Sequence, residues 1–275
     1  MIINILTGGG GYSEYKKCLI WDGETRLERE LTAEQRKYLL KSSSAWMIRN
    51  IYDWDYGRPT NFWELINDTP RKIEELPSKT RNQIRRCFRD CEIRRLENSE
   101  LVESDGYTVF AEAFKRYKDV SVNIARREDW ERSILENDTS EFWGVFTRED
   151  CRLIAFAINT VKGKSVGYNT LKAIPSMMNK HYPYFGLLFE MNRHYLEELR
   201  FNYVSDGFRS VTEHSNIQPF LEKNFLFRKA YCRMNLQYAP WLGLIVKLLY
   251  PFRNLIPILK IRHILNFEEI ARGKC

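Results

Sequence analysis

The residues from 141 to 238 constrain the fold most, because their hydrophobic pattern changes period from strand to helix and back. Three short apolar runs come first, bounded by glycine and charged residues, and they indicate an antiparallel three-stranded meander. Apolar residues then recur at helical spacing, and two more strands follow with a short helix between them. The predicted strands are 141–147, 153–158, 165–171, 201–205 and 225–238, and the predicted helices are 183–200 and 215–223.

Composition places the chain among globular proteins with an anionic partner. Hydrophobic residues make up 44% of the 275 positions, which is enough to bury a core. The net charge of +7 is concentrated in residues 79–95, with seven basic and two acidic residues, and in residues 239–275, with six and two. Clustered positive charge suggests phosphates, nucleic acid or a lipid surface as the partner.

The cysteines and the N-terminus favour a cytoplasmic protein. The six cysteines have no CxxC spacing, so reduced thiols are expected. Residues 1–6 are too short for a signal-peptide core, and no apolar run reaches the length of a membrane-spanning helix. The glycines at 8–11 lack the Lys-Ser/Thr of a phosphate-binding P-loop, so a hairpin or an arm is favoured there.

Residues 31–66 predict a short helix and two added strands. The helix spans 31–41 with Thr32 as its N-cap. The strands 45–51 and 61–66 are expected to form a hairpin, closed by a loop of alternating aromatic and acidic residues. Asp53-Trp-Asp55 in that loop has the D-x-D form of some glycosyltransferase metal sites, but no nucleotide-binding βαβ unit surrounds it. We therefore predict no metal, and expect Trp54 and Tyr56 to line an acceptor pocket.

The stretch 76–92 predicts an amphipathic helix, with Ser78 or Thr80 as its cap. Its apolar stripe explains two cysteines as small buried hydrophobic residues. The stripe consists of Ile84, Cys87, Phe88 and Cys91, and the basic face consists of Lys79, Arg81, Arg85, Arg86 and Arg89. The basic face is either simply solvated or a binding surface for phosphate.

The element order and some motifs resemble the GNAT superfamily of N-acyltransferases, in particular the branch around the FemAB/FemX peptidoglycan-bridge enzymes. Phe220-Leu-Glu-Lys-Asn-Phe-Leu-Phe-Arg-Lys-Ala-Tyr231 is similar to the stretch that joins the family's last helix to its last strand. The resemblance implies an α+β fold, a mixed, mostly antiparallel sheet flanked by helices. It divides the chain into an N-terminal extension with the β-hairpin, 1–78, an acyltransferase domain, 79–238, and a C-terminal tail, 239–275.

The resemblance also implies where the chemistry lies. In the family, the fourth and fifth strands splay apart and hold the donor carbonyl; here these strands are 165–171 and 201–205. The loop after the fifth strand, 206–216, is rich in groups that move protons or donate hydrogen bonds. The catalytic candidates are Asp206, Ser210, Glu213 and His214, with Asn216 and Arg209 as binding residues. A polar loop that caps the next helix is the alternative.

The donor predicted from the resemblance is acetyl-CoA or another acyl-CoA. Residues 172–186 replace the family's pyrophosphate loop, so phosphate would bind at a helix N-terminus formed by Tyr184, Phe185 and Gly186, with Lys180. Leu221 replaces the tyrosine that often protonates the thiolate, and Leu226 replaces a glycine. An inactive or repurposed fold is therefore an alternative.

The acceptor is expected to be an amine, such as an amino sugar or a lipid-linked cell-envelope precursor, attacked without a covalent enzyme intermediate. A FemX-like, aminoacyl-tRNA-dependent transferase is one alternative, although the chain lacks the coiled-coil arm that such enzymes often carry. A non-catalytic module that binds RNA or an anionic surface is another. The apolar tail at 241–265 is broken by prolines. It either lies in a membrane interface, making the protein peripheral to the inner membrane, or covers the protein's own sheet or a second subunit.

Overall fold

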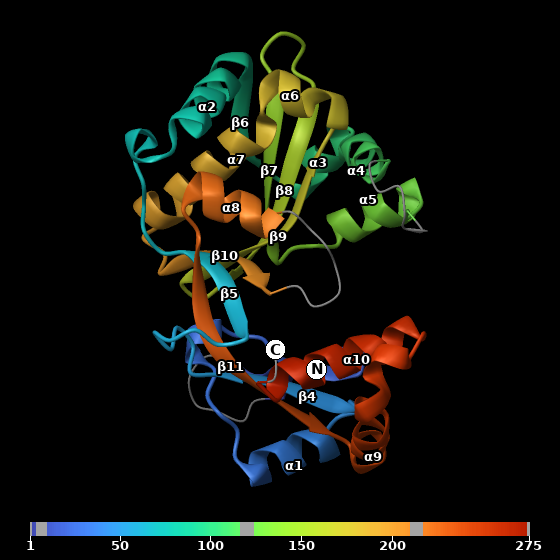
Figure 1. The fold of residues 1–275 in the computed structure, drawn as a ribbon. Helices are drawn as coiled ribbons and strands as arrows, with labels where there is room; N and C mark the ends of the chain where they lie inside the picture. Colours follow the sequence, from blue (N-terminus) through green and yellow to red (C-terminus); the bar gives the residue numbers. More distant parts are fainter. Residues whose placement is uncertain (1, 4–9, 116–123, 210–216, 274–275) are drawn as a thin grey trace. The chain divides into compact units, whose positions relative to one another are not determined.

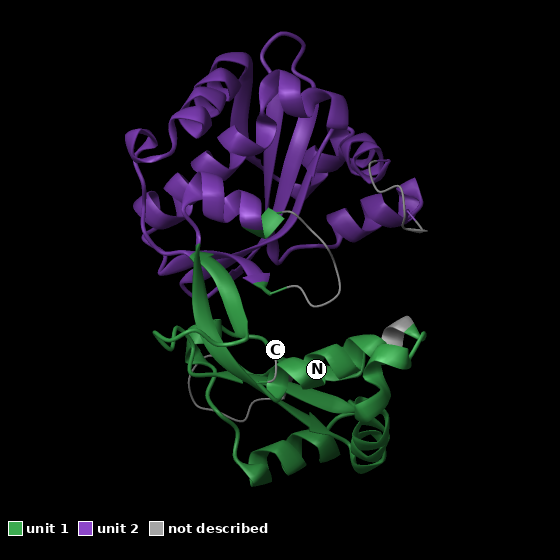
Figure 2. Ribbon diagram, in the orientation of Figure 1, with its two compact units in different colours: residues 1–66, 208–218, 228–275 green, residues 67–207, 219–227 purple. Residues whose placement is uncertain are grey.

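The computed structural model describes residues 2–3, 10–115, 124–209 and 217–273. The chain forms two compact units (Figures 1 and 2). Unit 1 contains both ends of the chain, and unit 2 is formed mainly by the middle. The long last strand pairs with strands of the N-terminal region, which brings both ends of the chain into unit 1. Unit 1 is 1–66, 208–218 and 228–275; unit 2 is 67–207 and 219–227.

The sheet of unit 2 confirms the predicted meander. Its central strand, β8, is buried without interruption from Leu153 to Ala157, because helices cover both faces of the sheet. The three meander strands pair antiparallel, and β10 joins β9 in parallel. The strand order is β10, β9, β8, β7 and β6. The strands are β6 (Cys91–Leu96), β7 (Ser140–Thr147), β8 (Leu153–Lys162), β9 (Ser165–Ala173) and β10 (Tyr203–Phe208).

The helices of unit 2 lie on both sides of this sheet (Figure 1). The helix α7 packs across β8 and against α2, whereas α4 packs on β8 and β9 and Trp130 of α5 contacts the Phe156 ring. Neither predicted cap residue of α2 is confirmed: the helix begins after Pro77, and buried Thr80 donates instead to Asn224 Oδ1 (3.0 Å). The helices are α2 (Ser78–Asp90), α3 (Asn98–Glu103), α4 (Gly106–Phe114), α5 (Arg127–Leu135), α6 (Met178–His181), α7 (Pro183–Asn192) and α8 (Ile217–Phe225).

The sheet of unit 1 is organised by β11, the longest strand among the described residues. Its first half pairs antiparallel with β5 and its second half with β4. The predicted hairpin of 45–51 and 61–66 is therefore wrong, because β11 lies between the two strands and pairs with both. The strands are β1 (Ile2–Ile3), β2 (Tyr12–Tyr15), β3 (Cys18–Trp21), β4 (Met47–Tyr52), β5 (Phe62–Asn67) and β11 (Arg228–Tyr238).

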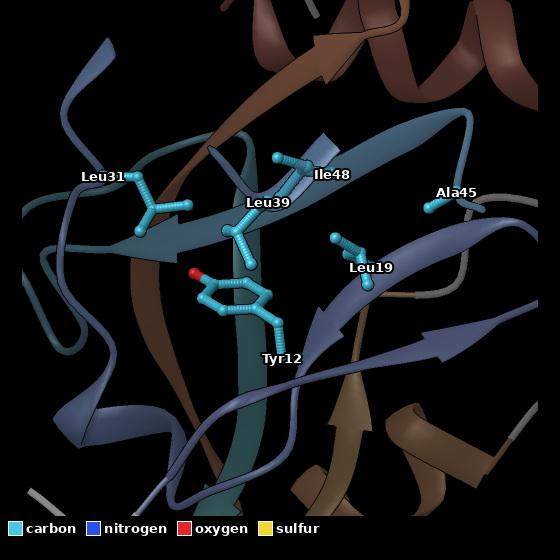
Figure 3. Close-up of a cluster of buried hydrophobic side chains, with 6 residues drawn as sticks. All are labelled: Tyr12, Leu19, Leu31, Leu39, Ala45 and Ile48. Carbon is cyan, nitrogen blue, oxygen red and sulfur yellow. The ribbon is translucent and has the colours of Figure 1, made fainter. Parts of the chain in front are cut away.

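The helix α1 (Ala33–Lys41) closes a small core on this sheet. Thr32 caps it as predicted: its hydroxyl accepts from the Gln35 N–H, and the Gln35 side chain accepts from the Thr32 N–H. Leu39 of α1 then packs among apolar side chains from three strands and the segment before the helix (Figure 3). This cluster consists of Tyr12, Leu19, Leu31, Leu39, Ala45 and Ile48.

The C-terminal tail forms α9 (Pro240–Leu249), a 3₁₀ segment (Tyr250–Leu255) and α10 (Leu259–Ala271). Both helices pack on β11. Leu242 and Val246 are buried with Leu265 in one cluster, and Ile270 joins a second cluster with residues of the sheet. The tail therefore covers the protein's own sheet with one of its faces, as one of the two predictions had it. No helix of the described residues is long and apolar enough to cross a membrane.

Candidate active site

The strands β9 and β10 begin side by side and then separate. They form three parallel pairs, from Tyr203 opposite Ser165 to Ser205 opposite Gly167. Beyond these pairs β9 continues to Ala173 along β8, while β10 continues to Phe208 with no further partner on β9 among the described residues. The two strands therefore separate after these three pairs, as the family resemblance implied, and we refer to this separation as the gap between β9 and β10.

A β-bulge explains why the strands separate at this point. The register between β8 and β9 shifts so that Ile158 lies opposite Thr170 and Asn159 opposite Tyr168, which leaves Asn169 as the extra residue. A bulge bends and twists its strand, and bulges are frequent beside active sites. Here it follows Gly167, the last residue of β9 that pairs with β10. The edge of β9 beyond the bulge thus has backbone groups that an extended ligand can bind.

Asp206 lies on the part of β10 that has separated from β9. Before it, Ser205 is buried, and its hydroxyl oxygen accepts a hydrogen bond from the Gly207 N–H (2.8 Å). Gly207 has a φ of +88°, which favours glycine over any residue with a side chain. Asp206, between these two residues, is half-buried. A carboxylate at the opening of such a gap can take a proton from an amine.

The rest of the predicted catalytic loop lies outside the described residues. Ser210, Glu213, His214 and Asn216 all belong to the 210–216 segment, so their predicted roles stay predictions.

The N-terminus of α7 is packed rather than open. Pro183 has no N–H, and the Phe185 N–H donates to the Tyr182 carbonyl (3.0 Å). The Tyr184 hydroxyl donates to the carbonyl of Leu171 on β9 (3.2 Å). A helix N-terminus binds phosphate through its free N–H groups, so few remain here for that purpose.

The two other predicted donor-binding residues differ in exposure. Gly186 is buried, and a Cβ on it would lie 2.5 Å from Cys87 Sγ and 2.6 Å from Ile93 Cδ1. The glycine therefore permits α7 to approach α2 closely. Lys180 is exposed on the short helix α6. Among these predicted residues, Lys180 has the charge and the exposure that an anionic group requires.

The two replacements noted in the family motif have clear structural settings. Leu221 is fully buried in α8, so its position contributes only packing. Leu226 adopts a φ of +57°, the left-handed conformation that glycine accommodates without strain. The backbone thus retains a glycine-type turn between α8 and β11, although the residue has a side chain.

A buried polar cluster around Tyr195 was not predicted. The Tyr195 hydroxyl donates to Glu141 Oε2 (2.6 Å) and accepts from Trp143 Nε1 (3.0 Å) and Asn159 Nδ2 (3.2 Å). Burial raises the pKa of this phenol, with the Glu141 carboxylate as the next cause. The segment Arg193–Glu198 is a π-helix, a form that often marks functional or strained positions. The apolar residues of this segment have the spacing of an ordinary helix, so no local pattern indicates the cluster.

The predicted acceptor residues all belong to unit 1, but they lie in different surroundings. Arg209 stacks on the Trp63 ring, 4.8 Å from its centre, and donates to the Asn61 carbonyl (2.7 Å). Lys229 also lies over the Trp63 ring, at 4.7 Å. Trp54 instead donates to Glu64 Oε2 (2.7 Å). Because Trp63 and Glu64 are consecutive on β5, they face opposite sides of the sheet, which separates Arg209 from Trp54.

The D-x-D segment is held by arginines of β11. Asp55 pairs with Arg228 through two contacts of 2.8 and 2.7 Å. Asp53 lies 3.5 Å from Arg233, which also donates to the Tyr56 hydroxyl (2.9 Å) and stacks on its ring. Both carboxylates therefore have cationic partners, and the segment connects β4 with β5 across β11. No group of three or more metal-ligating side chains occurs in the described part of the chain.

No protein-family model matches the sequence, and no curated protein matches it. Solved structures are similar at low identity. The crystal structure of FemX has 10% identity and a TM-score of 0.49, and the match covers 72% of this chain and 73% of that one. The structure of L-PGS from Bacillus licheniformis has 10% identity and a TM-score of 0.49, with 87% and 83% covered. These similarities assign no activity or substrate to this chain.

Proposed function

We propose that this protein transfers an acyl group from an activated ester to an amine, with the donor carbonyl held in the gap between β9 and β10. The separation of these strands at the Asn169 bulge is the observation that carries the proposal. Beyond the bulge, backbone N–H groups of β9 that have no partner on β10 can donate to an extended donor and to the oxyanion that forms on its carbonyl.

The chemistry is a direct displacement. The amine nitrogen attacks the donor carbonyl, a C–N bond forms, and the bond to the leaving sulfur or oxygen breaks. Asp206, on the separated part of β10, takes the proton that the amine must lose. Glu213 and His214 are the other candidates for this role. The leaving group takes its proton from water or from one of these groups, because Leu221 cannot supply one.

The donor is proposed to be an acyl-CoA thioester, with Lys180 contacting its phosphates. The packed N-terminus of α7 favours a second candidate, an aminoacyl-tRNA, whose 3′ end would enter the same gap without a pyrophosphate cradle. The acceptor is proposed to be an amino sugar or a lipid-linked amine.

Calorimetric titration distinguishes these donors. The wild-type protein is titrated with acetyl-CoA, with a long-chain acyl-CoA and with an aminoacyl-tRNA. Saturable binding of a thioester that weakens in Lys180→Gln supports acyl-CoA. Binding of the aminoacyl-tRNA alone supports the second candidate, provided that the uncharged tRNA binds more weakly. Equal binding of charged and uncharged tRNA, with no thioester bound, would instead indicate a nucleic-acid-binding module and contradict the proposal.

A further inference from the structure

The C-terminal tail has a second apolar face that no described part of the chain covers. On α9, Leu242 and Val246 face the core, whereas Leu244 and Leu248 are about 60% exposed (60% and 62%). The exposed face continues through the 3₁₀ segment, where Leu255 is 80% exposed. We call this face the apolar patch; it consists of Trp46, Trp241, Leu244, Ile245, Leu248, Phe252, Leu255 and Ile258.

The members of the patch on α9 share one side of that helix. Trp241, Leu244, Ile245 and Leu248 recur at helical spacing, and the exposed Phe252 and Leu255 follow in the 3₁₀ segment. Trp46, from the turn before β4, contacts Trp241 with ring centres 5.3 Å apart, so the patch extends beyond the tail. Isolated apolar residues on a surface are ordinary, but a continuous patch indicates a partner.

The charge around the patch points to an anionic surface. Residues 240–266 contain four basic residues and no acidic residue. Lys247 and Arg262 are exposed, whereas Arg253 is paired with Glu269 (2.7 Å). A second copy of the chain docked on this face would bring the exposed Lys247 and Arg262 of one copy near like charges of the other. Anionic lipid headgroups would instead neutralise these cations while the acyl chains accept the apolar side chains.

We propose that the apolar patch docks this protein onto an anionic membrane surface, with α9 lying in the plane of the interface. Leu244, Leu248 and Leu255 enter the headgroup boundary, and Lys247 and Arg262 contact lipid phosphates. Trp241 and Trp46 lie at the depth that tryptophan favours in membranes. This surface is independent of the gap between β9 and β10, so it stands whether or not the proposed transfer is correct.

Vesicle co-sedimentation tests the proposal. The full chain is mixed with vesicles of phosphatidylcholine alone or with 30 mol% phosphatidylglycerol (roughly the anionic fraction that gives a strong surface potential). We expect binding to the anionic vesicles that weakens with salt. Leu248→Asn should lower the affinity for the vesicles about tenfold or more, because one leucine side chain no longer enters the lipid. Leu135→Asn is the matched control, since Leu135 is 50% exposed on α5.

The outcomes separate the alternatives. Loss of vesicle binding in both Leu244→Asn and Leu248→Asn, with Leu135→Asn unchanged, supports the membrane surface. The proposal is overturned if the wild-type protein does not bind the anionic vesicles, or if Leu248→Asn binds them as tightly as wild type. If light scattering shows a wild-type dimer that Leu248→Asn converts to a monomer, and no vesicle binding occurs, the patch is an interface between two copies and the proposal is wrong. Both leucines are largely exposed, so circular dichroism should show an unchanged fold.

Discussion

Glu28 gives the sharpest prediction about stability, because it is a buried carboxyl in a polar pocket. It is 2% exposed, and burial raises its pKa from the ordinary 4.5 to about 7, although its hydrogen bonds oppose this shift. One oxygen, Oε1, accepts from the Tyr12 hydroxyl (2.7 Å), from Asn50 Nδ2 (3.0 Å) and from the Ile51 N–H (2.9 Å). Because burial outweighs these hydrogen bonds, Glu28 is mainly protonated in the folded protein below about pH 7.

The sign of the pH effect follows from this shift. Between pH 4.5 and 7 the folded state holds a proton on Glu28 that the unfolded state has lost, so the free energy of unfolding falls as the pH rises. A shift of about 2.5 pH units corresponds to about 3 kcal/mol. The contribution of Glu28 is therefore fully present below pH 4.5, decreases through this window and is lost above pH 7.

The substitution Glu28→Gln tests this reasoning, because the amide has the shape of the protonated carboxyl and cannot ionise. Its oxygen can still accept from Tyr12, Asn50 and Ile51. We expect the free energy of unfolding of Glu28→Gln, relative to wild type, to rise by about 3 kcal/mol between pH 4.5 and pH 8. Urea unfolding at a series of pH values measures it, and exposed Glu34→Gln serves as the control. A constant difference between Glu28→Gln and wild type at every pH would refute the argument.

The other predictions concern unit 2. Tyr195→Phe removes a hydroxyl that is hydrogen-bonded to Glu141, Trp143 and Asn159, so the free energy of unfolding measured in urea should fall by about 1–3 kcal/mol. The exposed Tyr38→Phe should leave it unchanged. Gly186→Ala forces a methyl group against Cys87 and Ile93, so the free energy of unfolding should fall by about 1–3 kcal/mol and the thermal midpoint should fall with it. An unchanged midpoint would show that α7 does not pack closely on α2. Asp206→Asn should slow amide formation by about 100-fold or more with donor affinity retained, whereas exposed Asp138→Asn should not; equal rates would remove Asp206 as the base.

Local patterns predicted most elements of unit 2. The runs at 141–147, 153–158 and 165–171 correspond to β7, β8 and β9 with changes at their ends, because each run is bounded by turns. β7 and β8 are also buried on both faces over most of their length. The helix predicted at 183–200 is present, but its last turns are a π-helix. That change is stabilised by contacts of Tyr195 with strands of the sheet, and a local pattern carries no information about them.

Long-range pairing explains what the sequence missed in unit 1. β4 and β5 are close in the chain and look like a hairpin, yet β11, more than 150 residues later, pairs with both. Pairing between distant segments has no local signature, so the sequence pattern predicts a hairpin of the two neighbouring strands instead. The sequence also leaves open what the tail covers. Because α9 is apolar on both faces, only the folded chain shows that one face packs on the sheet and that the apolar patch is exposed.

Hydrogen–deuterium exchange with bound donor shows whether the donor occupies the gap between β9 and β10. The protein is incubated with the donor selected by titration, and exchange is followed by mass spectrometry in peptides covering β9, β10 and α2. We expect slower exchange in residues 168–173 of β9 and in residues 206–208 of β10, because the donor occupies the gap between them. Protection limited to the basic helix α2, or no protection in β9 at saturating donor, would contradict it.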